Sequence, residues 1–227
     1  MTGPVDAVLV DSGGVLLLPG PDAFRRLLRP FGARPDDETC RRAHYAGMHE
    51  VDRLGAPDWP LVDRVVARAA GVPEARIDEA VAAVESLYRT EPWVPIEGAA
   101  HALVMLQEAG YPLAVVSNAE GTMEAQLAAH RVCSVDGGEV AEVAVVIDSA
   151  LVGVEKPDPG IFDLALKVLD VDPGRCVYLG DSVHFDVAGA LAAGLRPIHV
   201  DPFGLCGAPA AHDHVPSLAA FVEDLVG

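Results

Sequence analysis

Residues 7–14 read Ala-Val-Leu-Val-Asp-Ser-Gly-Gly, an apolar run that ends in a carboxylate and a glycine-containing turn. A short apolar run bounded by turn residues is typical of a buried strand. Asp11 therefore stands just past the carboxyl end of a predicted strand, on a turn that is flexible enough to admit a ligand. We predict that Asp11 is a nucleophile.

Two further apolar runs and one lysine place polar groups in a similar way along the chain. They are residues 113–116 before Ser117-Asn118, residues 177–179 before Gly180-Asp181, and Lys156-Pro157 before a predicted helix. In an open parallel sheet, the residues just past the carboxyl ends of the strands converge on one crevice. We therefore expect an Asp, a hydroxyl group, a Lys and further Asp residues to gather there.

The rest of the chain indicates an α/β fold with a helical insertion. Residues 19–92 show only helical patterns, such as the apolar spacing i, i+3, i+4, i+7 in residues 24–31. From residue 93 onward predicted helices and strands alternate, which favours right-handed crossovers and a mostly parallel sheet. Residues 133–143 fit no element well, and residues 204–214 read as an irregular loop.

Composition and charge exclude several classes of partner. The chain has 227 residues, 51% of them hydrophobic, which suits one domain or a domain with an insertion. Its formal net charge of -18 repels duplex nucleic acid and anionic membranes, so we expect neither as a partner. No apolar run is long enough to cross a bilayer, and the N-terminus lacks the basic segment of a secretory signal.

The four cysteines favour a reducing compartment. They are Cys40, Cys133, Cys176 and Cys206. Because they are far apart and form no C-x-x-C pair, they disfavour both a zinc site and a disulfide framework. We expect a cytoplasmic protein, and the sequence leaves the oligomeric state open.

The predicted crevice holds the groups that a carboxylate needs in order to attack a phosphate dianion. Such attack is slow unless a metal ion and a lysine beside the nucleophile remove the charge repulsion. Asp181 and Asp186 offer oxygen ligands and Lys156 offers a second cation, and hard oxygen donors favour Mg²⁺ over zinc. Ser117 and the backbone amide of Asn118 are expected to hold phosphoryl oxygens next to a helix start.

Taken in order, these segments resemble the four motifs of the haloacid dehalogenase-like hydrolase superfamily. The matching residues are Asp11-Ser12-Gly13-Gly14-Val15-Leu16, Ser117-Asn118, Glu155-Lys156-Pro157-Asp158-Pro159, and Gly180-Asp181-Ser182 with Asp186. The resemblance covers nearly the whole predicted core, and the helical insertion lies where the family has its C1 cap.

The resemblance implies a fold, a cofactor and a reaction. It implies a Rossmann-like core of residues 1–18 and 93–227, with a helical C1 cap of residues 19–92. It also implies an aspartyl-phosphate intermediate on Asp11, formed by a phosphatase that acts on a small phosphorylated metabolite. The ligands of Mg²⁺ would be Asp11, the backbone carbonyl of Gly13 and Asp181, while Asp186 would act through the outer shell or a water molecule.

One departure from the family pattern concerns the general acid and base. Most phosphatases of this family carry a second Asp two residues after the nucleophile, and Gly13 occupies that position here. General acid-base help is worth roughly 10²–10⁴ in rate, so its loss slows turnover without preventing attack by the carboxylate. A water molecule or a cap side chain such as His44 or His49 could replace the missing group.

Three alternatives follow from the same motifs. The first is a catalytically weak or inactive binding or regulatory protein that keeps the fold. The second is a 2-haloacid dehalogenase, but Gly13 and Gly180-Asp181 differ from the pattern that this chemistry usually shows. The third, a phosphonoacetaldehyde-type hydrolase, needs a cap lysine for a Schiff base, and no lysine precedes Lys156.

Overall fold

The computed structural model describes residues 4–207 and 212–227, which form two compact units. Of the described residues, the sheet unit contains 4–16, 95–202 and 212–227, and the helical unit contains Leu17–Val94 and Phe203–Gly207. Within the described part of the chain, no helix combines the length and the apolar character needed to cross a membrane.

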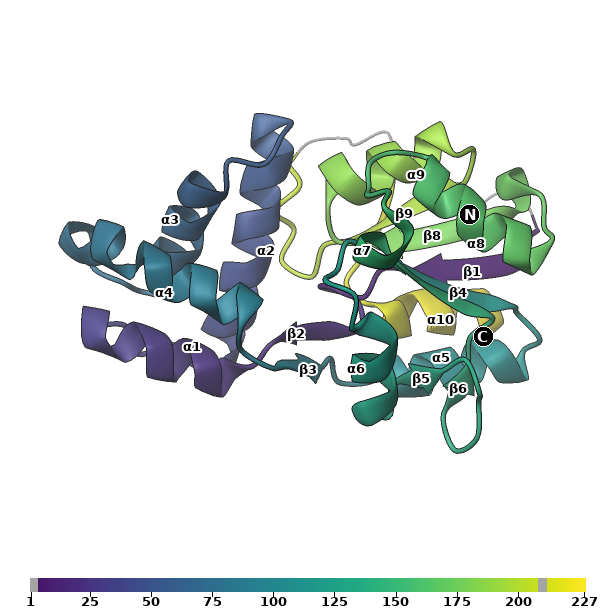
Figure 1. Cartoon of the computed structure of the whole chain (residues 1–227), viewed down its shortest axis with the longest axis horizontal. Coiled ribbons are helices and arrows are strands. Elements are labelled where there is room, and N and C mark those ends of the chain that lie inside the picture. Colours follow the sequence, from purple (N-terminus) through teal and green to yellow (C-terminus); the bar gives the residue numbers. More distant parts are fainter. Residues whose placement is uncertain (1–3, 208–211) are drawn as a thin grey trace. The chain divides into compact units, whose positions relative to one another are not determined.

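The sheet unit is built on six strands in the order β10-β9-β8-β1-β4-β7 (Figure 1). The strands are β1 (Ala7–Val10), β4 (Leu113–Ser117), β7 (Val145–Asp148), β8 (Cys176–Gly180), β9 (Arg196–Val200) and β10 (Asp213–Val215). Each neighbouring pair is parallel. The prediction of a mostly parallel sheet is therefore confirmed.

The central position of β1 follows from its apolar sequence. Each of its four residues is at most 1% exposed, as expected for a parallel strand that is covered on both faces. Val8 pairs with Leu113 of β4 on one side and with Val177 of β8 on the other. The loops that follow these three strands therefore leave the sheet side by side at one edge.

Helices cover both faces of the sheet, with α8 and α9 on one face and α5 and α10 on the other (Figure 1). The helices of this unit are α5 (Ala99–Glu108), α6 (Met123–Ala129), α7 (Ser149–Val152), α8 (Gly160–Leu169), α9 (Ala188–Ala192) and α10 (Leu218–Val226). Ala7 and Leu9 of β1 share a buried core with Ile161 and Phe162 of α8. This packing fixes β1 and the loop after it.

The helical unit contains four helices and a short two-stranded sheet. The helices are α1 (Pro21–Leu28), α2 (Asp37–Leu54), α3 (Trp59–Ala69) and α4 (Ile77–Arg89), and the strands are β2 (Leu17–Pro19) and β3 (Trp93–Pro95). The side chains of Asp36 and Asp58 cap the N-termini of α2 and α3 by accepting hydrogen bonds from backbone amides. Gly47 lets α2 and α3 pack closely, because a Cβ atom there would lie 2.7 Å from Val66.

The structure differs from the sequence-based expectation in three places. The pattern of residues 185–193 predicts one helix, but a π-helical turn (Val183–Val187) precedes α9. Two short parallel strands, β5 (Cys133–Ser134) and β6 (Ala141–Glu142), lie in the stretch that fits no element from sequence. The expected irregular loop at 204–214 ends in strand β10, whose pairing with β9 a single sequence does not reveal; residues 208–211 lie outside the described residues.

Candidate active site

The predicted nucleophile lies at the centre of the sheet edge where β1, β4 and β8 end. The backbone amide of Asp11 continues the sheet by donating a 2.8 Å hydrogen bond to the carbonyl of Leu179. Its carboxylate Oδ1 accepts a 2.7 Å hydrogen bond from the amide of Ser12. Strand pairing therefore fixes the backbone of Asp11, and the amide of Ser12 orients its carboxylate.

A buried lysine connects two of the predicted carboxylates. The Nζ atom of Lys156 lies 2.9 Å from Oδ1 of Asp11 and 2.7 Å from Oδ1 of Asp186. It also donates a 3.0 Å hydrogen bond to the hydroxyl oxygen of Tyr178. The side chain of Lys156 is only 3% exposed, so water screens these charges weakly.

The side chain of Asn118 positions this lysine. Its Oδ1 accepts a 2.7 Å hydrogen bond from the backbone amide of Lys156, and its Nδ2 donates a 3.0 Å bond to the carbonyl of the same residue. The residue that follows β4 thereby holds the loop before α8. Only the backbone amide of Asn118 was expected to act from the sequence, so this side-chain role is new.

Tyr178 and Asp186 form a buried network around the lysine. The hydroxyl group of Tyr178 lies 3.0 Å from Oδ1 of Asp186 and 2.9 Å from the carbonyl oxygen of Val116. The second carboxylate oxygen of Asp186 accepts a 3.0 Å bond from the amide of Ser182. Both oxygens of Asp186 thus have protein donors. This arrangement favours an outer-shell role for Asp186 over direct binding of a metal.

Two glycines leave the space that the carboxylates occupy. Gly14 has a φ of +66°, and a Cβ atom there would lie 2.0 Å from Oδ2 of Asp181. A Cβ atom at Gly180 would lie 2.2 Å from the carboxylate carbon of Asp186. Any larger residue at either position would displace a carboxylate, which explains why both motif segments contain glycine.

The charges of this cluster are unbalanced in the protein alone. Carboxylate oxygens of Asp11, Asp181 and Asp186 lie within 4.8 Å of one another, and all three residues are buried. Lys156 offsets one of the three negative charges. Burial raises the pKa of Asp11 to about 7, with Asp181 and Asp186 adding to the rise and Lys156 opposing it. Burial lowers the pKa of Lys156, but the two neighbouring carboxylates outweigh it and raise the net value. A divalent cation would balance the remaining charge, so the residues fit one.

Two further residues support the loops of this site and were not expected from the sequence. Tyr178, described above, is one. The other is Asp148 at the end of β7, whose carboxylate accepts hydrogen bonds from the amides of Gly121 and Met123. Asp148 pairs in register with Ser117, so it stabilises the turn that follows β4. A carboxylate directly after an apolar run is the sequence signal that could have identified it.

The remaining predicted site residues of the sheet unit lie on the same edge of the sheet. Ser117 is the last residue of β4 and is 3% exposed. Gly13 follows Ser12 in the loop after β1 and is partly exposed. The roles predicted for these two residues depend on a ligand, so they stay predictions. His44 is packed against Tyr88 and Trp93 within the helical unit and is 2% exposed.

The sequence profile of the haloacid dehalogenase-like hydrolase family matches residues 5–194. The chain belongs to this family. The resemblance drawn from the motifs is thereby confirmed, and so is the fold that it implied. The match covers the loops that carry Asp11, Lys156 and Asp181.

Curated relatives of this haloacid dehalogenase-like hydrolase include phosphatases. The plasmid-encoded phosphoglycolate phosphatase of Cupriavidus necator is 34% identical over 212 residues, which are 90% of this chain and 84% of that protein. The haloacid dehalogenase-like hydrolase domain-containing protein 3 of Mus musculus is 32% identical over 171 residues, 70% of this chain and 64% of that protein. The chain therefore spans slightly less than two thirds of the mouse relative.

Solved structures share the fold at lower identity. The crystal structure of a HAD phosphatase from Thermococcus onnurineus covers 98% of this chain and 99% of its own, with a TM-score of 0.61 and 22% identity. A dehalogenase and the L-2-haloacid dehalogenase of Xanthobacter autotrophicus are also among the similar structures. At these identities the likeness shows the fold alone, so it does not distinguish the two chemistries.

Proposed function

We propose that this protein is a Mg²⁺-dependent phosphomonoester hydrolase that acts on a small phosphorylated metabolite. The observation that carries the proposal is the 2.9 Å ion pair between Asp11 and Lys156 inside a cluster of three buried carboxylates. The phosphoglycolate phosphatase of Cupriavidus necator, which matches 90% of the chain, supports a phosphoester as substrate.

The carboxylate cluster suits a hard divalent cation. We assign the ligands to Asp11, the backbone carbonyl of Gly13 and Asp181, with Asp186 acting through the outer shell. The oxygens of this set favour Mg²⁺ over softer metals. When bound, the ion supplies positive charge that reduces repulsion between a carboxylate and a phosphate.

The first step is attack by Asp11 on phosphorus. Ser12 and Lys156 both donate to Oδ1 of Asp11, so we assign the attack to Oδ2. An oxygen–phosphorus bond forms to Asp11 as the bond to the leaving oxygen breaks, which gives an aspartyl-phosphate. Lys156 offsets the charge on the phosphoryl oxygens, while Ser117 and the amide of Asn118 orient them.

The second step is hydrolysis of the aspartyl-phosphate by water, which releases inorganic phosphate and restores the carboxylate. Gly13 has no side chain to protonate the leaving oxygen or to activate this water. The missing acid therefore lowers the rate of hydrolysis least for substrates that have a relatively acidic leaving group. We further propose that residues 19–92 are the cap of the family, which selects the substrate and limits water during the first step.

The test is release of inorganic phosphate from a panel of phosphorylated metabolites, with and without Mg²⁺. Asp11→Asn is expected to lower the rate by about 10⁴-fold or more, because it removes the nucleophile from a group of residues that act together. The matched control is Asp163→Asn, which changes an exposed aspartate on α8 in the same unit. Phosphate release that survives Asp11→Asn in folded protein would refute the proposal.

The same experiment separates the alternatives. A protein that binds Mg²⁺ and phosphorylated ligands without releasing phosphate would be a binding or regulatory protein, as the absent acid at Gly13 allows. Metal-independent release of halide from a 2-haloacid would indicate a dehalogenase. Release of phosphate that depends on both Mg²⁺ and Asp11 supports the proposed phosphatase.

A further inference from the structure

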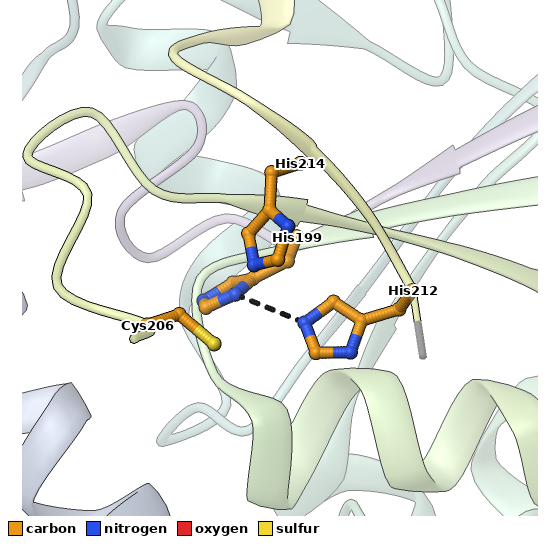
Figure 2. A group of neighbouring side chains, drawn as sticks. All are labelled: His199, Cys206, His212 and His214. Atoms are coloured by element: carbon orange, nitrogen blue, oxygen red, sulfur yellow. Dashed lines mark hydrogen bonds between the residues drawn. The ribbon is translucent and has the colours of Figure 1, made fainter. Parts of the chain in front are cut away.

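A second cluster of potential metal ligands lies on the sheet unit, outside the carboxylate site. His199 is in β9 and His214 is in β10, and the strand register pairs the two residues directly. His212 lies just before β10, and its ring packs beside that of His214. Strand pairing thus brings the three imidazole rings together, as Figure 2 shows.

The three rings are close enough to share one ion. Their centroids are 5.3 Å (His199 to His212), 5.1 Å (His199 to His214) and 4.6 Å (His212 to His214) apart. A ligand nitrogen of each lies within 4.8 Å of the others. Nδ1 of His199 and Nε2 of His212 are 3.4 Å apart, which is close to the separation of about 3.3 Å expected between nitrogens around tetrahedral zinc.

A backbone hydrogen bond orients His199 for metal binding. Its Nε2 lies 3.2 Å from the carbonyl oxygen of Asp181, an acceptor only, so Nε2 carries the proton. Nδ1 of His199 then has the free electron pair and faces His212. Histidines that bind metals usually donate their other ring N–H to a carbonyl or carboxylate in this way.

The donors also distinguish this cluster from the carboxylate site. Imidazole nitrogens suit zinc and similar transition metals, whereas carboxylate and carbonyl oxygens suit Mg²⁺. We propose that His199, His212 and His214 bind one Zn²⁺ ion that joins β10 to β9 at the edge of the sheet. A zinc site was disfavoured from the sequence on the spacing of the cysteines alone. The pairing of β9 with β10, which brings the histidines together, cannot be seen in the sequence.

The proposed site is built on the three histidines alone. Figure 2 also draws Cys206, but this residue belongs to the segment Phe203–Gly207 of the helical unit. A water molecule can complete a tetrahedral site with three histidine ligands.

The first test measures zinc bound to the untagged full-length protein after incubation with Zn²⁺ and removal of excess metal. We expect one equivalent in the wild type and at least about tenfold weaker binding in His212→Gln and His214→Gln, measured against a chromophoric chelator. His101→Gln is the control, because His101 is exposed on α5. Failure to retain zinc, or equal retention by the cluster variants and the control, would overturn the proposal.

A second variant distinguishes the two sites. Asp181→Asn removes a carboxylate of the Mg²⁺ site and keeps the backbone carbonyl that orients His199. We expect this variant to retain the zinc equivalent. Loss of zinc from Asp181→Asn together with full retention by His212→Gln would place the ion among the carboxylates and refute the histidine site.

Cobalt reports the geometry independently of the amount bound. We expect the visible bands of tetrahedral Co²⁺ in the wild type and their loss in the His212→Gln, His214→Gln double variant, while circular dichroism shows that the variant is folded. Tetrahedral bands that persist in the double variant would contradict the proposal.

Discussion

The carboxylate site and the histidine cluster lie at the carboxyl edge of one sheet but differ in charge. In the first, Asp11 and Asp186 share a single buried lysine, and a cation would balance the charge that remains. In the second, the donors are imidazoles, of which His199 is buried and His214 is exposed. The first site therefore depends on electrostatic balance, whereas the second depends on strand register.

Among the substitutions that compare the two sites, the largest expected effect comes from removing the buried lysine. Lys156→Met is expected to lower phosphate release by about 10²–10³-fold and to destabilise the metal-free protein by about 3–5 kcal/mol, since it leaves buried carboxylates without a partner. Chemical denaturation and phosphate release measure the two effects. Zinc binding at the histidine cluster should not change, which would show that the two sites are electrostatically separate.

Lys167→Met is the matched control, because Lys167 is the other lysine of the chain and is exposed. It is expected to change stability by less than about 0.5 kcal/mol. Equal effects of the two lysine substitutions would contradict the role assigned to Lys156.

The sequence predicted the carboxylate site because each of its parts is local. Asp11 directly follows an apolar run and Asp181 follows one after Gly180, and parallel topology alone carries such positions to one edge. The family resemblance then supplied their roles. The lysine, the two aspartates and the turn after β4 could thus be assigned before any pairing was known.

The parts that were missed depend on tertiary packing. Tyr178 is hidden within the apolar strand β8, and only the structure shows its hydroxyl beside Lys156. The histidine cluster requires the pairing of β9 with β10, and the three-residue strand β10 gives no periodic signal of its own. Site residues in the loop after a single strand can be predicted from the sequence. Residues that meet across two strands can be predicted only when the register of the strand pair is known.

The two sites should respond to pH in opposite directions. The folded pKa of Asp11 is about 7, above its ordinary 3.8, so folded protein keeps a proton that the unfolded chain loses. Stability of the metal-free protein should therefore fall between about pH 4 and 7, by on the order of 2–4 kcal/mol. Burial and His199 lower the pKa of His214, so the contribution of His214 to the stability of the folded protein instead falls as pH drops below about 6.5.

The measurement is the free energy of unfolding across this range for wild type and Asp11→Asn. Their difference isolates Asp11 from other carboxyls, such as Asp63, whose pKa burial raises to about 6. Mg²⁺ should stabilise the wild type most above pH 7, where Asp11 is ionised. If the difference in unfolding free energy between the wild type and Asp11→Asn does not vary with pH, the pKa of Asp11 is not raised in the folded protein.

A smaller effect is expected where a glycine makes room for a ligand. Gly14→Ala places a methyl group against the carboxylate of Asp181 and should cost about 1–3 kcal/mol more than Gly110→Ala. Gly110 has a similar positive φ of +89° but open space around its Cβ position. Subtracting the destabilisation caused by Gly110→Ala from that caused by Gly14→Ala removes the conformational cost of a positive φ. The remainder is the cost of the steric clash with Asp181.

Mg²⁺ affinity should fall with Gly14→Ala, because Asp181 must move, and zinc affinity should stay the same. Thermal unfolding with and without each metal checks both results. If the two alanine substitutions prove equally costly, the loop after β1 can relax, and the close packing of Gly14 against Asp181 does not constrain the site.

The smallest effect is expected from Asn118→Ala, which removes none of the proposed metal ligands. The substitution removes both hydrogen bonds that hold the backbone of Lys156, so the amine should sample positions away from Asp11. We expect kcat to fall about tenfold, equivalent to about 1.4 kcal/mol, as is usual for groups that orient a functional side chain. Gln126→Ala is the control, since the amide of Gln126 bonds only locally to Thr122 within the described contacts.

The pKa of Asp11, followed through the pH dependence of stability, should rise further in Asn118→Ala because the neighbouring amine is held less firmly. A fall in kcat without that rise would mean that Asn118 acts on the substrate directly, through its position after β4, and that the lysine loop is stable without it.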